Sequence, residues 1–228
     1  RGGFRGRLGV GGDVWLYHLT VGCGPVLGLY WRLGLDGPRE NIPREGPLIV
    51  AANHSSFMDP WFLAMAFPRP MRYLITHRWY YKSKIWEAVF RANGTIPVKE
   101  RDPRGTIQQL CEHLAEGEAI GMFPEGKISD DGRIQKLQSG VARLAANSGA
   151  PVLPVGIRGG FESLPRHRRF PRPNRVRIMV GETTRFPGSP LERPGRKEIE
   201  GFNAELLRQL TALSGKRARA AEPVPEHA

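Results

Sequence analysis

The sequence predicts an α/β protein in which helices cover both faces of a mostly parallel, mixed β-sheet. Short apolar runs rich in β-branched residues alternate with longer stretches in which apolar residues recur every three or four positions. The run PLIVAAN is apolar throughout, which is typical of a strand covered on both sides. We therefore expect an αβα-layered domain, with an additional apolar helical segment before it.

The expected strands are short apolar segments bounded mainly by proline or glycine. Each has the length of an ordinary strand. They span residues 47–53, 71–76, 94–98, 119–123, 151–157 and 175–181.

Three other stretches have helical periodicity. The first lies within 104–118 and should end at Gly117, and the second lies within 139–150 and should end at Gly149. The third carries a long apolar stripe near the end of the chain, made of Ile199, Phe202, Leu206, Leu210 and Leu213.

Composition divides the chain into three parts. Residues 37–214 should form the main domain. Residues 1–36 are basic and apolar, and we expect them to associate with a membrane. Residues 215–228 contain one valine and no other large apolar residue, so we expect this tail to be disordered.

The N-terminal part contains VWLYHLTVGCGPVLGLY, a nearly uncharged run at 14–30. It is at the lower length limit for a spanning helix, and Pro25 should break or kink it. We expect a bent apolar element on the bilayer surface; a helix packed on the core is the alternative. The aromatic residues suited to the interface are Trp15, Tyr17, Tyr30 and Trp31.

A net charge of +12 favours an anionic partner, which can be nucleic acid, an acidic membrane surface or a phosphorylated substrate. Residues 158–177 hold seven arginines and one glutamate, although a solvated face explains such a run equally well. Only Phe161 and Phe170 offer stacking surfaces there, so no nucleic-acid partner is expected. Two cysteines without a Cys-x-x-Cys motif predict a reducing compartment, no metal and no cofactor.

The stretch NHSSFMD, at 53–59, follows the first predicted strand, where α/β sheets bind ligands. A tight turn would fold the Asp59 carboxylate back onto His54 and orient the ring as a general base. Asp59 followed by proline also fits a simple helix N-cap, and the two interpretations are compatible. No Gly-x-Ser-x-Gly motif is present, and Ser55 is too close in sequence to serve as nucleophile. The reacting hydroxyl should therefore belong to the substrate.

Two further groups follow predicted strands. Glu125 and Gly126 lie in FPEGKIS, where glycine permits close approach of a ligand, although a tight turn with an exposed glutamate is the alternative. Lys99 and Arg101 lie in GTIPVKER and suit a phosphate. Backbone N–H groups near Gly126 or in VLPVGI are candidate donors to an oxyanion.

In this order and at these separations, NHSSFMD, GTIPVKER, FPEGKIS and VLPVGI resemble the four blocks of the glycerolipid (lysophospholipid) acyltransferase family. The resemblance spans about residues 45–160. It implies an αβα fold and acyl transfer from acyl-CoA or acyl-carrier protein to the hydroxyl of a lysophospholipid. It also implies membrane-seated helices at the N-terminus and a location on the cytoplasmic face of the membrane, peripheral or monotopic.

The resemblance also implies roles for single residues. His54 matches the general base, Asp59 its orienting partner, and Arg101 the group that binds the acceptor phosphate. Glu125 and Gly126 match the acceptor-binding pair. The third block usually continues Thr-Arg-Ser, whereas this chain has Lys127-Ile128-Ser129, so Lys127 is the expected substitute cation, with Arg133 or Lys136 as reserves.

The favoured acceptor is 1-acylglycerol-3-phosphate, which would give phosphatidic acid. Because the usual arginine is absent, glycerol-3-phosphate, another lysophospholipid or a glycolipid hydroxyl remains open as acceptor. A different class of protein, a non-catalytic basic lipid-binding protein on anionic membranes, would not need His54.

Overall fold

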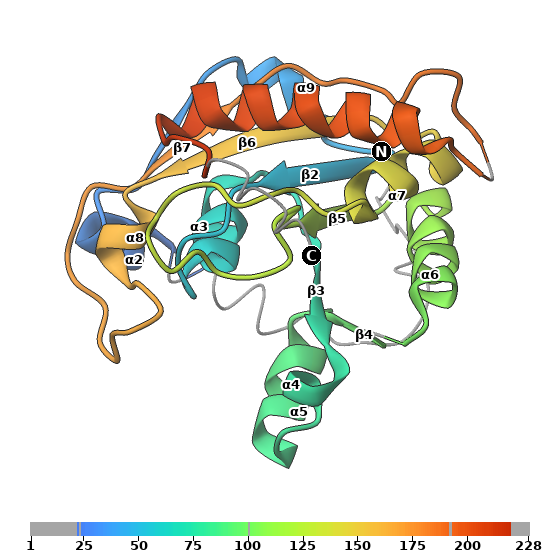
Figure 1. Cartoon of the computed structure of the whole chain (residues 1–228). Coiled ribbons are helices and arrows are strands. Elements are labelled where there is room, and N and C mark those ends of the chain that lie inside the picture. Colours follow the sequence, from blue (N-terminus) through green and yellow to red (C-terminus); the bar gives the residue numbers. More distant parts are fainter. Residues whose placement is uncertain (1–21, 23, 100, 192, 220–228) are drawn as a thin grey trace, which may run out of the picture.

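The computed structural model describes residues 22, 24–99, 101–191 and 193–219 (Figure 1). Seven strands form one sheet in the order β1-β7-β6-β2-β5-β3-β4. The strands are β1 (Gly34–Asp36), β2 (Leu48–Ala52), β3 (Arg72–Thr76), β4 (Ile96–Val98), β5 (Ala119–Met122), β6 (Val152–Arg158) and β7 (Arg177–Val180).

The sheet is mixed but mostly parallel, as predicted. β6, β2, β5, β3 and β4 run in the same direction, and among the strand pairs of the described residues the pairing of β6 with β7 alone is antiparallel. Each of the six predicted segments contains a strand. The sequence analysis missed β1, whose three residues pair with β7 while the Asp36 carboxylate forms an ion pair with Arg177. A strand of three residues is too short to show a periodic apolar pattern, and it forms because β7 pairs with it.

Helices cover both faces of the sheet. The helices are α2 (Gly24–Tyr30), α3 (Asp59–Ala66), α4 (His77–Tyr80), α5 (Lys84–Ala92), α6 (Pro103–Ala115), α7 (Gly140–Ser148), α8 (Gly160–Ser163) and α9 (Arg196–Ser214), with a 3-10 turn at Arg39–Asn41. Of these, α4 and α5 do not cover the sheet but extend away from it (Figure 1). The three predicted helices correspond to α6, α7 and α9. Gly149 and Gly215 end α7 and α9 with positive φ values of 67° and 66°, which glycine adopts without strain.

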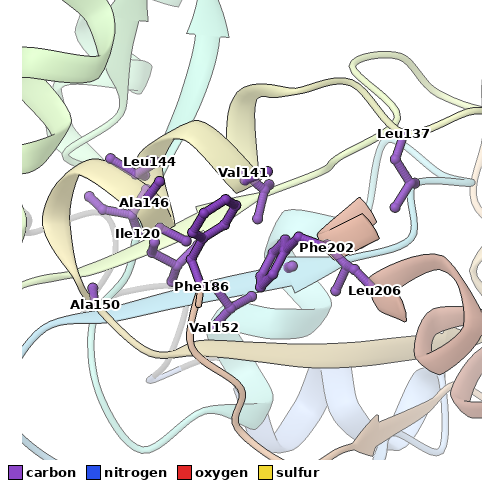
Figure 2. Close-up of a cluster of buried hydrophobic side chains, with 14 of the residues drawn as sticks. Ile120, Leu137, Val141, Leu144, Ala146, Ala150, Val152, Phe186, Phe202 and Leu206 are labelled. Atoms are coloured by element: carbon purple, nitrogen blue, oxygen red, sulfur yellow. The ribbon is translucent and has the colours of Figure 1, made fainter. Parts of the chain in front are cut away.

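Two apolar cores lie on opposite sides of the sheet. In β2, Ile49 and Ala51 face the core shared with α6, α7 and α9, which Figure 2 shows in close-up. Leu48, Val50 and Ala52 face the core shared with α3. All five side chains are fully buried, which explains why this segment is apolar throughout.

The long helix α9 runs along β6 on one face of the sheet (Figure 1). A Cβ atom added to Gly156 of β6 would lie 2.4 Å from the carbonyl carbon of Leu213, so only glycine permits this approach. The close packing holds the end of α9, and the residues that follow it, near the carboxyl edge of β6.

The predicted membrane segment is described only in part, because residues 14–21 and 23 lie outside the described residues. Among the described residues, no helix combines the length and apolar character needed to cross a membrane. The prediction that Trp31 lies at a membrane interface is wrong: its side chain is 4% exposed, packs edge-on against Phe62, and donates from Nε1 to the carbonyl oxygen of Arg172. Tyr30, another of the aromatic residues predicted at that interface, is 44% exposed.

The predicted disorder of the tail is wrong for its first residues. The N–H of Ile134 donates to the carbonyl oxygen of Arg217, and the N–H of Arg219 donates to that of Ile134. This backbone pairing orders residues 215–219, and composition does not reveal it because it needs no apolar side chain. Residues 220–228 lie outside the described residues.

Candidate active site

The polar loops that follow β2 and β5 lie side by side because these strands are parallel neighbours in the sheet. The loop after β2 is anchored first by Asn53, whose side chain donates to the carbonyl oxygen of Ile157 and accepts from its N–H. The N–H of Ser129, in the loop after β5, donates to the carbonyl oxygen of His54 at 2.8 Å. A backbone hydrogen bond therefore fixes the two loops to each other, and the Asn53 side chain fixes the first loop to β6.

Asp59 is the centre of the loop after β2. Its carboxylate is 0% exposed, and Oδ2 accepts hydrogen bonds from Nδ1 of His54 at 3.0 Å, from the N–H of Ser55 at 2.7 Å and from the N–H of Ser56 at 2.8 Å. The turn therefore folds Asp59 back onto His54, as the sequence predicted. Asp59 is not the N-cap, however: Met58 occupies that position, and Asp59 is the first residue of α3, with proline second.

The contact with Asp59 determines which nitrogen of the neutral His54 ring carries the proton. Because Oδ2 is an acceptor that already receives two backbone N–H groups, Nδ1 is the donor and Nε2 remains the nitrogen that can take a proton. The ring stacks on Phe123, with centroids 3.9 Å apart and planes 15° apart, and its side chain is 15% exposed. An oriented imidazole with limited solvent contact is suited to general-base chemistry.

Glu125 connects the second loop to the first. Its carboxylate accepts from the N–H of His54 at 2.6 Å and from the N–H of Gln135 at 2.7 Å. The residue is 3% exposed, and this burial raises the pKa of Glu125 to about 7 despite the two hydrogen bonds, which act in the opposite direction. A tight turn is present, since Gly126 has a φ of +72°, but the alternative prediction of an exposed glutamate is wrong.

Two of the backbone donors suggested for an oxyanion, those of Gly126 and Ile157, are already engaged. The N–H of Gly126 donates to the carbonyl oxygen of Phe123 at 3.0 Å, and that of Ile157 donates to Asn53. These two groups are therefore unsuited to the role that the sequence analysis gave them.

Gly160, which sequence reasoning missed, lies behind the pair of His54 and Asp59. A Cβ atom at this position would lie 2.6 Å from Oδ1 of Asp59 and 3.2 Å from Oγ of Ser55. Both of these oxygen atoms are buried and have no hydrogen-bond partner among the described residues. The two glycines that follow VLPVGI and Arg158 are the sequence signal that could have pointed to a close approach here.

Lys216 is a second residue that sequence reasoning missed, because it belongs to the predicted tail. Its Nζ is buried, has no hydrogen-bond partner among the described residues, and lies 5.6 Å from the centroid of the Phe161 ring. Burial lowers the pKa of Lys216, whereas Glu162, Asp59, Glu125 and Asp131 oppose this shift through their charge. The C-terminal segment thus adds a cation to the electrostatic surroundings of the site.

The predicted phosphate-binding residues are more distant. Lys99 and Arg101 are exposed and follow β4, at the same sheet edge as His54. Two strands, β5 and β3, separate β4 from β2, so the distance across the sheet is roughly 14 Å at the usual strand spacing. Lys127 is exposed in the loop after β5. The structure therefore brings His54, Asp59, Glu125 and Gly126 together, with Lys127 in the same loop as Glu125, and with Lys99 and Arg101 further along the sheet edge.

One group of potential metal ligands occurs in the described part of the chain, and it is remote from this site. Ligand atoms of His113, Glu116 and Glu118 lie within 4.8 Å of one another, just before the start of β5 and hence at the opposite edge of the sheet. Arg72 already donates two hydrogen bonds to the Glu118 carboxylate, one of them from Nη2 at 2.7 Å. This cluster is an ion-pair network that ties β3 to β5.

Comparison with solved structures supports the fold. The crystal structure of the 1-acyl-sn-glycerophosphate (LPA) acyltransferase PlsC from Thermotoga maritima superposes with a TM-score of 0.66. The match covers 90% of this chain and 82% of that one, with 23% sequence identity. At this identity the likeness establishes the shared architecture.

Two relatives found by sequence are also named as 1-acyl-sn-glycerol-3-phosphate acyltransferases. The chloroplastic 1-acyl-sn-glycerol-3-phosphate acyltransferase LPAT1 of Arabidopsis thaliana is 28% identical over 140 residues, which are 60% of this chain and 38% of that protein. The 1-acyl-sn-glycerol-3-phosphate acyltransferase of Pseudomonas aeruginosa is 26% identical over 220 residues, which are 93% of this chain and 79% of that protein. The chain thus spans well under two thirds of the length of the plant relative.

The family model described as Acyltransferase matches residues 37–158, which is more than half of the chain. The matched region contains His54, Asp59, Arg101 and Glu125, whereas Gly160 and Lys216 lie outside it. By this match, the chain belongs to the acyltransferase family.

Proposed function

We propose that this chain transfers a fatty acyl group from a thioester donor to the free hydroxyl of a lysophospholipid, with 1-acylglycerol-3-phosphate as the favoured acceptor. The observation that carries the proposal is the contact of His54 with the buried Asp59, while among the described residues no serine, threonine or cysteine side chain is hydrogen-bonded to Nε2 of His54. Ser55, the adjacent hydroxyl, is 1% exposed, and its Oγ faces Gly160. A base without a nucleophile of its own fits direct transfer to a substrate hydroxyl.

In the proposed reaction, Nε2 of His54 takes the proton of the acceptor hydroxyl as its oxygen attacks the thioester carbonyl carbon. A C–O bond forms, and the carbonyl oxygen becomes an oxyanion. When this intermediate collapses, the C–S bond breaks, and the leaving thiolate takes the proton from the imidazolium. The Asp59 carboxylate stabilises the imidazolium between these two steps.

Charge favours a phosphorylated acceptor. Lys99, Arg101 and Lys127 are exposed cations at the carboxyl edge, and the names of the relatives point to a lysophosphatidate acceptor. The free hydroxyl and the phosphate of 1-acylglycerol-3-phosphate are on adjacent carbons, so a phosphate contact from Arg101 requires its long, exposed side chain to reach back along the sheet edge towards His54. We further propose that the reaction takes place at an anionic membrane surface on the cytoplasmic face, with acyl-CoA or acyl-carrier protein as donor.

Release of free thiol from acyl-CoA and from acyl-carrier protein, measured with a panel of acceptors, tests this function. We expect release only when an acceptor is present, and fastest release with 1-acylglycerol-3-phosphate rather than glycerol-3-phosphate, a choline lysophospholipid or a glycolipid. Fastest release with another of these would reassign the acceptor. Release without any acceptor would show a thioesterase, and no release with either donor would favour a non-catalytic lipid-binding protein.

A further inference from the structure

The helices α4 and α5 extend away from the sheet beyond the end of β3 (Figure 1). The end of β3 lies at the same edge as His54, with β5 between β3 and β2. This pair of helices exposes four large apolar side chains within eight residues: Trp79 (53%), Tyr81 (49%), Ile85 (76%) and Trp86 (45%). Soluble proteins rarely expose such a concentration without a partner.

The ring contact that joins the two helices lies beneath these side chains, and one edge of it is covered by Trp86, which stacks on Phe90 with centroids 5.5 Å apart. Tyr80 is buried, and its ring stacks on that of Phe90 with centroids 5.8 Å apart. Tyr80 and Phe90 therefore form the internal contact of the pair. The four exposed residues remain as an outward surface, which we call the α4–α5 surface: Trp79, Tyr81, Ile85 and Trp86.

Basic residues surround the α4–α5 surface. Between residues 77 and 92 the chain has four lysines or arginines and one acid, Glu87, which pairs with Lys84 at 3.2 Å. Nζ of Lys82 lies 4.4 Å from the centroid of the Trp79 ring, so a cation and an indole are in contact on this surface. The basic residues, all exposed, are Arg78, Lys82, Lys84 and Arg91.

Tryptophan and tyrosine beside lysine and arginine form the combination that favours the boundary between lipid headgroups and acyl chains. The rings enter the headgroup layer, while the cations remain with anionic headgroups. A protein partner large enough to cover this projecting pair would need acidic groups to match it, whereas an anionic bilayer supplies them over an unlimited area.

We propose that the α4–α5 surface docks the protein onto an anionic lipid bilayer and places the carboxyl edge of the sheet next to the membrane. The purpose of this docking rests on the proposed function, because a lipid acceptor held in the docked membrane would reach His54 without crossing water. It places the contact in residues 78–91, outside the N-terminal segment in which the sequence analysis located the membrane element.

Co-sedimentation of the full chain with vesicles tests the proposal without any turnover. The vesicles contain either phosphatidylcholine alone or phosphatidylcholine with phosphatidylglycerol. The apolar variant Trp79→Ser/Ile85→Ser/Trp86→Ser should lose at least tenfold in partitioning to the anionic vesicles. The charge variant Lys82→Ala/Lys84→Ala should lose roughly fivefold per lysine on anionic vesicles.

Two matched controls use exposed residues elsewhere. Phe170→Ser removes an 81% exposed aromatic residue outside α4 and α5, and Lys197→Ala removes a basic residue on α9. Both should bind vesicles like the unaltered chain. Thiol release with detergent-dispersed substrates should be the same in all four variants, so failure of docking and failure of the proposed function give different results.

Equal sedimentation of the apolar variant and the Phe170 control would overturn the proposal. It would also be overturned if, without vesicles, acrylamide fails to quench the fluorescence contributed by Trp79 and Trp86, because another part of the chain or a second copy would then cover the surface. Because the altered side chains are exposed, a circular dichroism spectrum and a melting temperature like those of the unaltered chain are expected for each variant.

Discussion

The carboxyl edge of the sheet has two regions of opposite character. At the ends of β2 and β5, the side chains of Asp59 and Glu125 are buried, and backbone N–H groups donate to both carboxylates. At the ends of β3 and β4, residues 77–79, 81–86, 99 and 101 are exposed. The first region has the fixed geometry that a proton transfer requires. The second has the exposed cations Lys99 and Arg101, which suit an acceptor phosphate, and the rings of α4 and α5, which suit a bilayer surface. Changes in the first region should therefore lower kcat, whereas changes in the second should affect the acceptor KM or vesicle binding.

The largest difference in kcat between the two regions should appear when the histidines that follow β2 and β3 are each changed to alanine. His54→Ala removes the general base, and we expect kcat to fall at least about a hundredfold. His77→Ala, the matched change at an exposed histidine of the other region, should leave kcat with detergent-dispersed substrates unchanged. Steady-state kinetics of both variants, with circular dichroism to confirm folding, make the comparison. Equal kcat values for His54→Ala and the unaltered chain would remove the proposed mechanism.

A smaller effect should follow from Gly160→Ala, which disturbs the buried region from behind. The added methyl group overlaps with Oδ1 of Asp59, so the carboxylate must move and the His54 ring loses its fixed orientation. We expect kcat to fall about tenfold with little change in either KM, because a misplaced base affects the chemical step. Gly201→Ala, in α9 with nothing within 4 Å of the added atom, is the control and should retain full activity. A Gly160→Ala enzyme with unaltered kcat would argue that the Asp59 contact is unimportant.

In the exposed region, Arg101→Ala should act on binding. Loss of one phosphate contact should raise the KM for the acceptor by roughly tenfold, while the KM for the acyl donor and kcat stay close to their original values. The control is Arg104→Ala, an exposed arginine in the first turn of α6. If Arg101→Ala raised both KM values equally, the phosphate-binding role would be wrong.

The smallest difference concerns stability rather than turnover. Burial raises the pKa of Glu125 from an ordinary value near 4.5 to about 7, so the folded chain holds this proton over a pH range in which the unfolded chain releases it. The unfolding free energy should therefore decrease as pH rises from about 4.5 to 7, by on the order of 3 kcal/mol at most. Thermal unfolding across this range should show the decrease in the unaltered chain and not in Glu125→Gln. The exposed-region control, Glu87→Gln, should keep it, and an identical slope in Glu125→Gln would contradict the assignment.

The sheet and the pair of His54 and Asp59 could be predicted because their signals are local. Apolar runs mark β2 and β6, and a six-residue turn brings the pair together wherever the surrounding chain lies. The burial of Lys216 and the strand β1 could not be predicted, and the two glycines after Arg158 indicate a close approach without identifying Asp59 as the group approached by Gly160. Each depends on contacts between segments far apart in sequence, such as Gly160 with Asp59 and Arg217 with Ile134.

The burial of Trp31 also depends on contacts with segments far away in the sequence. Its apolar neighbours favoured a membrane interface, and sequence alone could not reveal that Phe62 and the carbonyl oxygen of Arg172 complete its surroundings. Conversely, the exposed aromatic residues of α4 and α5 have the apolar character of a core in sequence. Only the structure shows that they face outward.

The most direct test of the central claim, that Asp59 holds His54 as a base with Nε2 free, is a ¹⁵N spectrum of the chain labelled at histidine. The His54 signals are identified by their loss in His54→Ala. The account predicts that the neutral ring carries its proton on Nδ1 and that this preference is lost in Asp59→Asn. A neutral ring protonated on Nε2 in the unaltered chain, or the same tautomer in both proteins, would contradict it.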